Sequence, residues 1–167
     1  PCKHYTMHVI KYLITILYLF ACAASVTAQT TYESLRAGYN AYDRSNYSKA
    51  EPHYRRAAAN DPSNWNAAYN LGNTLYEQGK YEDAAKVFEQ AIANAPDARA
   101  KADVLHNAGN ALLKQNKFKE AIKAYENSLR QRPGDADTKR NLQMAKKKLK
   151  EEQQQQQKEQ NKQDQQQ

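Results

Sequence analysis

The feature that most constrains this chain is an internal repeat with a period of 34 residues. One run of small, aromatic and proline positions occurs three times in register: Ala50, Tyr54, Ala57 and Pro62; Ala84, Phe88, Ala91 and Pro96; Ala121, Tyr125, Ser128 and Pro133. The first shift is 34 positions and the second is 37, with a three-residue insertion around residues 96–101. Gly38, Gly72 and Gly109 follow the same shifts. A repeat of this length predicts one supersecondary unit that is stacked three times.

Each copy divides into two amphipathic segments at a short polar break, which predicts two helices joined by a tight turn. Gly79 and Asn116 lie in the second and third breaks, and both residue types suit the left-handed position that ends a helix. A proline separates each copy from the next, because proline is disfavoured inside helices. We expect the small residues Gly72 and Ala84 to let the two helices of the second copy approach closely.

The second copy carries the residues that identify the unit. Tyr69-Asn70-Leu71-Gly72-Asn73, then Tyr81-Glu82-Asp83-Ala84-Ala85, and then Phe88, Ala91 and Pro96 resemble a tetratricopeptide repeat. The third copy matches this pattern almost as well, whereas the first has Ser34 and Ala37 where large apolar residues are usual. The resemblance implies an all-α fold, a right-handed superhelical α-solenoid of three helix pairs at about residues 31–64, 65–98 and 102–135.

The residues after the third copy predict a helix that closes the stack. Leu142, Ala145 and Leu149 recur at helical spacing within residues 135–152 and are expected to cover the last repeat. The lysines and arginines of this segment are interpreted as a solvated outer face, with a binding patch as the alternative. Residues 153–167 contain 10 Gln and no apolar stripe, so the sequence predicts a disordered tail.

The N-terminal segment has the pattern of a secretory signal peptide. From Met7 it runs through a basic start and an apolar core to the small residues Val26-Thr27-Ala28, which predicts cleavage between Ala28 and Gln29. We therefore assign residues 1–28 to a signal peptide with upstream residues, and the protein to the periplasm or cell envelope. The alternative is a lipoprotein that is processed at Leu19-Phe20-Ala21-Cys22 and lipidated on Cys22.

The resemblance also implies a protein-binding groove, because the first helix of each pair lines the concave side of such arrays. The residues that would line it are Tyr32, Leu35, Tyr39, Tyr42, Asn66, Tyr69, Asn73, Tyr76, Asp103, His106, Asn110 and, from the closing helix, Arg140. Tyrosine gives contact area, and a carboxamide bonds both the N–H and the C=O of an extended peptide. The alternative is that Asn70, Asn73, Asn107 and Asn110 serve helix packing.

Several functions are disfavoured by the sequence. Tetratricopeptide domains that clamp the C-terminal carboxylate of chaperones use lysine and arginine where this chain has Leu35, Asn66 and Asp103. The two histidines after Ala28 lie in different predicted helices, and there is no phosphate loop or nucleophile motif, so we predict no enzyme activity, metal site or cofactor. Most of the net charge of +7 lies at the two ends, which argues against nucleic-acid binding by the array.

The sequence thus predicts an exported scaffold that binds a protein or peptide segment. Its layout, with a signal sequence, three repeats and a tail rich in lysine and then glutamine, resembles the tetratricopeptide proteins of bacterial aerotolerance (Bat) operons. That resemblance implies a membrane-anchored von Willebrand factor A-type protein as partner. The alternatives are an envelope lipoprotein with a structural role, lipidated at Cys22, and a nucleic-acid binder that uses the basic C-terminal helix. Membrane association is expected to be indirect or through a lipid on Cys22.

Overall fold

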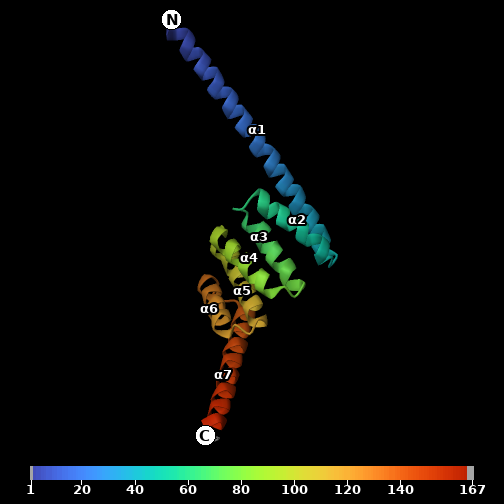
Figure 1. Ribbon diagram of the computed structural model, residues 1–167, viewed down its shortest axis with the longest axis vertical. Coiled ribbons are helices and arrows are strands. Elements are labelled where there is room, and N and C mark those ends of the chain that lie inside the picture. The colour runs from blue at the N-terminus through green and yellow to red at the C-terminus, as the bar shows by residue number, and fades with distance from the viewer. Residues whose placement is uncertain (1, 165–167) are drawn as a thin grey trace.

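The computed structural model describes residues 2–164, which form a stack of antiparallel helices (Figure 1). Within these residues there are seven α-helices and no strand: α1 (Cys2–Asp43), α2 (Tyr47–Asn60), α3 (Trp65–Glu77), α4 (Tyr81–Asn94), α5 (Ala98–Lys114), α6 (Phe118–Gln131) and α7 (Ala136–Asp164). The end of α1 pairs with α2, α3 with α4 and α5 with α6, while α7 covers the third pair. This confirms the predicted all-α solenoid of three helix pairs plus a closing helix.

The turn inside each pair is built in the same way three times. Ser45, Gly79 and Asn116 have positive φ values of 55°, 76° and 59°. One residue further on, a backbone N–H reaches back five residues to a carbonyl oxygen, at 2.9 Å from Lys80 to Leu75 in the second pair. This is the Schellman arrangement, which satisfies carbonyl groups that the end of the helix leaves free. Glycine and asparagine take the left-handed conformation most easily, so the local sequence fixes where the first helices of the second and third pairs end.

A glycine in the first helix of each pair lies against an aromatic ring of the second helix. A Cβ atom added to Gly72 would lie 2.5 Å from Cε1 of Phe88, which is closer than real contacts allow. Gly38 and Gly109 have the same relation to Tyr54 and Tyr125, at 2.8 and 2.6 Å. All three rings are almost fully buried. The missing side chain therefore makes the room in which the ring of the partner helix packs.

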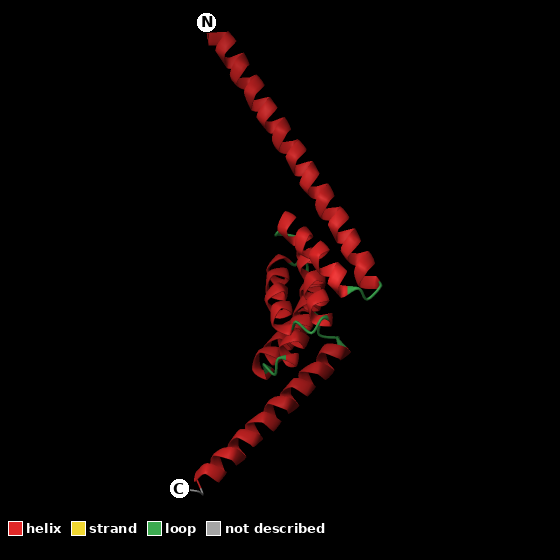
Figure 2. Cartoon of the chain, turned by 45° about the vertical axis from the view of Figure 1, so that its right-hand side comes forward, coloured by secondary structure: helices red, strands yellow, loops and turns green. Residues whose placement is uncertain are grey.

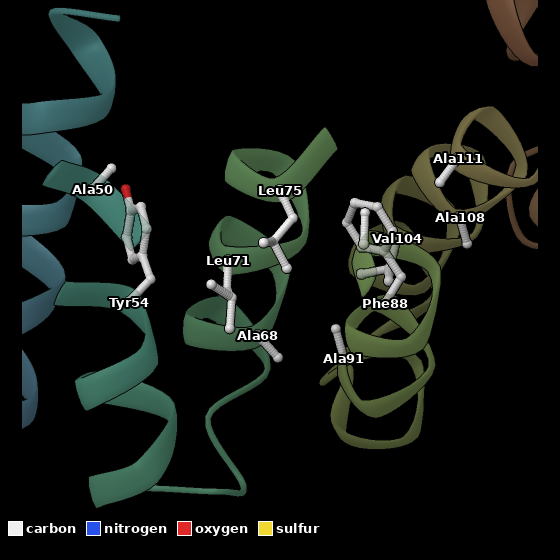
Figure 3. Close-up of a cluster of buried hydrophobic side chains, with 11 residues drawn as sticks. Ala50, Tyr54, Ala68, Leu71, Leu75, Phe88, Ala91, Val104, Ala108 and Ala111 are labelled. Atoms are coloured by element: carbon white, nitrogen blue, oxygen red, sulfur yellow. The ribbon is translucent and has the colours of Figure 1, made fainter. Parts of the chain in front are cut away.

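Packing between pairs uses small and branched apolar residues. Leu71 and Leu75 of α3 lie between Tyr54 on one side and Phe88 with Val104 on the other (Figure 3). Polar ties accompany this packing: Gln78 donates to the carbonyl of Tyr47 at 3.0 Å, and Gln115 donates to the carbonyl of Tyr81 at 2.9 Å. The ion pair of Lys80 with Glu51, at 2.8 Å, is a further contact between the first two pairs. Its hydrogen bond holds the pKa of the Glu51 carboxyl at about 2.

The N-terminal helix is longer than the array requires. Helix α1 begins at Cys2 and is continuous past the expected cleavage point after Ala28, since no glycine or proline interrupts it before Gly38. The described side chains before Thr31 are all exposed, and Thr31 is the first that is buried. The side chain of Cys22, which the lipidation alternative concerns, lies outside the described residues. Among the described residues, no helix is long and apolar enough to cross a membrane.

The C-terminal helix also differs from the prediction. Helix α7 continues to Asp164, where the sequence analysis expects a disordered tail from residue 153 (Figures 1 and 2). Glutamine, glutamate and lysine are good helix formers, and no glycine or proline stops the helix after the last apolar contact. Residues 153–164 are fully exposed, so this part of the helix is supported by its own backbone hydrogen bonds and not by packing. Residues 165–167 of the predicted tail lie outside the described residues.

The glycine contact gives the first test. We expect Gly72→Leu to destabilise the protein by about 1–3 kcal/mol, because the new side chain must displace the ring of Phe88. The measurement is the free energy of unfolding in urea, followed by circular dichroism at 222 nm.

Gly134→Ala is the matched control, because a Cβ atom there meets nothing within 4 Å. Its unfolding free energy should stay within about 0.5 kcal/mol of that of the parent protein. Equal unfolding free energies for Gly72→Leu and Gly134→Ala would contradict the packing role of Gly72.

Candidate functional site

A hollow with a volume of about 230 Å³ lies between the first helices of the three pairs. Its lining residues are Tyr42 from α1, Asn73, Tyr76 and Glu77 from α3, and Asn107 and Asn110 from α5. We call this hollow the central groove. Its walls come from helices that are separated by 34 to 37 residues in the sequence, so the groove exists only when the pairs are stacked. It is lined by hydrogen-bonding groups and aromatic rings, and one carboxylate is its only charge among the described residues.

Four asparagines form pairs along this surface, and we call them the asparagine ladder. Asn107 Nδ2 donates to Asn73 Oδ1 at 2.8 Å, and Asn141 Nδ2 of α7 donates to Asn110 Oδ1 at 2.9 Å. Asn73 Nδ2, Asn107 Oδ1 and Asn110 Nδ2 make no further hydrogen bond within the described part of the chain, and all three side chains are half-buried. Each pair therefore fixes its side chains and still offers donors and acceptors to a ligand.

Tyrosine pairs mark the turn side of the groove. Tyr42 lies edge-on to Tyr47, and Tyr76 lies edge-on to Tyr81, each with ring centroids 5.2 Å apart. Burial raises the pKa of the Tyr42 and Tyr76 hydroxyls above the usual value of tyrosine. Both phenols therefore stay protonated at neutral pH and remain hydrogen-bond donors. In the third pair Leu113 and Phe118 occupy these positions, so the groove becomes more apolar towards α7.

Eight of the twelve predicted groove residues fall into three groups. Those that line the central groove are Tyr42, Asn73, Tyr76 and Asn110. Tyr32 and Leu35 line a separate hollow of about 470 Å³ beside the loop between α2 and α3. Tyr39 is 63% exposed on α1, and Asn66 is exposed and accepts a hydrogen bond from Asn70 at 2.6 Å. The first copy thus contributes mainly exposed aromatic side chains, and only Tyr42 of its predicted residues forms part of the wall of the central groove.

The remaining predicted residues are used in packing or lie elsewhere. The ring of Tyr69 packs against Trp65 and Phe88, with centroids 5.9 and 6.2 Å away. Asp103 accepts a hydrogen bond from Arg132 at 2.6 Å. Arg140 is exposed on α7 and pairs with Asp137 of its own helix at 3.1 Å. Chaperone-clamping domains are expected to carry cations at the positions of Leu35, Asn66 and Asp103. Of these three residues, only Asp103 is acidic.

His106 belongs to the packing between α5 and α7. Its Nδ1 lies 2.6 Å from Oγ1 of Thr138, and its ring meets the edge of Tyr125 with centroids 5.9 Å apart. Burial lowers the pKa of His106 below the usual value of histidine, although Asp135 and Asp137 oppose this shift. The imidazole is therefore neutral at pH 7 and acts as part of the α7 contact.

Three residues of the site were absent from the sequence prediction of the groove. Glu77 directly follows Tyr76, and Asn107 lies one helical turn before Asn110, so the neighbouring groove residues on the same helices were the available signal for both. From the sequence, Asn107 is predicted only to serve helix packing. Asn141 lies in α7, which is outside the repeats, and no pattern marks it. Within residues 2–164 no cluster of histidine, cysteine, aspartate and glutamate could hold a metal ion.

Comparisons with known proteins agree on the repeat unit. A family model described as tetratricopeptide repeat matches residues 35–99, and a second with the same description matches residues 102–135. No curated protein matches the sequence significantly.

Solved structures of similar fold are also tetratricopeptide domains. The N-terminal domain of stress-induced protein-1 from C. elegans has a TM-score of 0.65 and 24% identity, over 72% of this chain and 97% of that domain. The second such domain of human RPAP3, in complex with the HSP70 peptide SGPTIEEVD, has a TM-score of 0.68 and 23% identity, over 72% and 98%. The Sgt2 domain from Aspergillus fumigatus has a TM-score of 0.66 and 25% identity, over 74% and 82%.

The ladder predicts a difference between two equivalent asparagines. Asn110 accepts a hydrogen bond from the buried hydroxyl of Tyr125 at 2.7 Å, whereas Phe88, the repeat equivalent of Tyr125, has no hydroxyl to donate to Asn73. We expect Asn110→Ala to cost about 1–3 kcal/mol, because the Tyr125 hydroxyl loses this acceptor, and Asn73→Ala to cost less. Urea unfolding of the two variants measures the difference.

Adding Tyr125→Phe to Asn110→Ala should restore part of the loss, since it removes the hydroxyl that lacks its acceptor. Equal costs for the two asparagines, or no recovery in the double variant, would show that Asn110 does not support Tyr125.

Proposed function

Because this chain belongs to the tetratricopeptide repeat family, we propose that it is a scaffold that binds an extended segment of another protein in the central groove. The observation that carries this proposal is the asparagine ladder. Its members are held by one another, so their orientation is set before a ligand arrives, and they keep free donors and acceptors. An extended peptide presents N–H and C=O groups in alternation, which is the pattern that carboxamides can bond.

The aromatic wall adds contact area to this recognition. Tyr42 and Tyr76 have rings that are already fixed by their edge contacts with Tyr47 and Tyr81. Ordering them on binding therefore costs little side-chain entropy, which favours affinity. Tyrosine is also enriched among the residues that dominate binding energy at interfaces.

The groove differs from a site for acidic chaperone tails. The human RPAP3 neighbour binds the peptide SGPTIEEVD, and the Spaghetti neighbour binds the HSP90 peptide SRMEEVD. Here the lining contains Glu77 and no lysine or arginine, and Asp103 is engaged with Arg132. Repulsion between Glu77 and an acidic tail disfavours such a ligand, so the proposed partner presents a segment that is not uniformly acidic.

We further propose that the protein acts in the cell envelope after export. The support is the pattern of residues 7–28 together with the start of packing at Thr31, because cleavage after Ala28 would remove no described side chain that is buried. The layout that resembles the aerotolerance proteins makes a membrane-anchored von Willebrand factor A-type protein the first partner to test.

The site of processing can be measured directly. Expression of the full chain in a bacterium, followed by mass spectrometry of the mature protein, should give an N-terminus at Gln29. A mature protein that begins at a lipid-modified Cys22 would establish the lipoprotein alternative. A protein that still begins at Met7 would contradict export.

The binding role is tested with a displayed library of random peptides of about 12 residues, a length that spans the stacked helices. We expect the parent protein to enrich peptides whose binding is weakened about tenfold or more by Tyr76→Leu combined with Asn73→Ala. Leucine is the natural residue at the equivalent position of the third pair, Leu113, so this change should keep the fold. Fluorescence anisotropy of labelled synthetic peptides gives the dissociation constants.

Tyr32→Leu is the matched control, because Tyr32 lies on α1 but lines a different hollow. It should leave the affinity for these peptides unchanged, and SGPTIEEVD should bind no better than a scrambled peptide. Failure to enrich any peptide, or equal losses in the control and the groove variant, would overturn the proposed function.

A further inference from the structure

Charged residues change sign along the turn side of the central groove. The last positions of the three first helices are equivalent in the repeat, and they are Asp43, Glu77 and Lys114. All three side chains are exposed, and none makes an ion pair within 4 Å among the described residues. A row of equivalent positions is therefore acidic in the first two pairs and basic in the third.

The negative end of this row rests on Glu77. Glu77 lines the central groove, beside the two tyrosines of its wall. Asp43 is followed directly by the exposed Arg44, which offsets its charge. The nearby cation Lys80 is occupied, because it pairs with Glu51 at 2.8 Å. Glu77 therefore keeps an uncompensated negative charge at the groove.

The positive end rests on Lys114, the last residue of α5. Lys117 is the repeat equivalent of Lys80, but Ala85 stands where Glu51 would supply the partner. Lys117 is exposed and has no ion pair within 4 Å in the part of the chain that the structure describes, but its charge, after that of Lys86, helps to lower the pKa of the Glu82 carboxyl, so Glu82 partly offsets it. On α7, Lys147 and Lys148 share Glu151, with Glu152 adjacent, so the charges there balance. The third pair thus presents the free ammonium group of Lys114 at the position equivalent to Glu77.

From this arrangement we propose that the groove selects segments that carry a basic and an acidic residue in one fixed order. The basic residue pairs with Glu77, and the acidic residue pairs with Lys114. Successive first helices lie roughly 10 Å apart. An extended chain advances about 3.3 Å per residue, so the two charges are about three residues apart. The uncharged residues between them lie over the asparagine ladder.

This inference rests on the proposed function and adds the class of ligand and its direction. Backbone contacts with carboxamides do not distinguish the two directions of a peptide strongly, because each amide offers both a donor and an acceptor. Opposite charges at the two ends do distinguish them, since the reversed peptide meets like charges at both ends.

The test exchanges the two charges in the protein. The library of random peptides is selected on the parent protein and on the double variant Glu77→Lys with Lys114→Glu, which has the same net charge. We expect peptides from the parent to share one order of basic and acidic residues, and peptides from the double variant to show the opposite order. Synthetic peptides that differ only in exchange of their two charged residues should differ about threefold to tenfold in affinity. This ratio should fall towards one in about 1 M salt.

A second exchange, Asp83→Lys with Lys119→Glu, is the control on the outer helices α4 and α6, where both residues are exposed. It should leave the selected order unchanged, and circular dichroism should show the same unfolding midpoint for all three proteins. A common order in both selections, or no order at all, overturns the charge inference; if binding still depends on Tyr76, the proposed function stands. A library that yields no peptide overturns the proposed function and this inference together.

Discussion

The close approach of a glycine to a buried aromatic ring is the contact on which the array depends. It occurs once in each helix pair, between Gly72 and Phe88 in the second and at the equivalent positions of the other two. The contact sets the distance between the two helices of a pair, because a side chain at the glycine would collide with the ring. Once that distance is set, the same residues meet in every pair, and the pairs can stack with one geometry.

The groove is a consequence of that stacking. Residues at the same repeat position lie side by side along the concave surface, and asparagines of α3, α5 and α7 meet there to form the ladder. The same rule places Asp43, Glu77 and Lys114 in one row. Recognition can therefore vary from pair to pair while the packing contacts stay the same, since the glycines and rings face inward and the ladder and charges face outward.

The two ends of the array show how far a helix can run without packing. Helix α1 extends back to Cys2, and α7 extends to Asp164, although the described residues at both extremes are exposed. The sequence predicts that the signal peptide ends at Ala28, from its processing pattern, and that the closing helix ends at Glu152, from its apolar contacts. Helical propensity alone carries the helix further when no glycine or proline stops it.

The sequence by itself determined the fold of this protein, because the information is local and is repeated. The period is visible by comparing one copy with the next. Within each copy, short stretches of sequence contain the left-handed residues Gly79 and Asn116 and the glycine and aromatic positions that pair. The tertiary structure alone decided which polar side chains are free to bind. Asn110 is paired by Asn141, and His106 is held by Thr138, and both partners lie in α7, which has no repeat pattern. Hydrogen bonds between residues about 30 positions apart depend on the exact rotation of stacked helices, and the amphipathic pattern of a sequence does not specify that rotation.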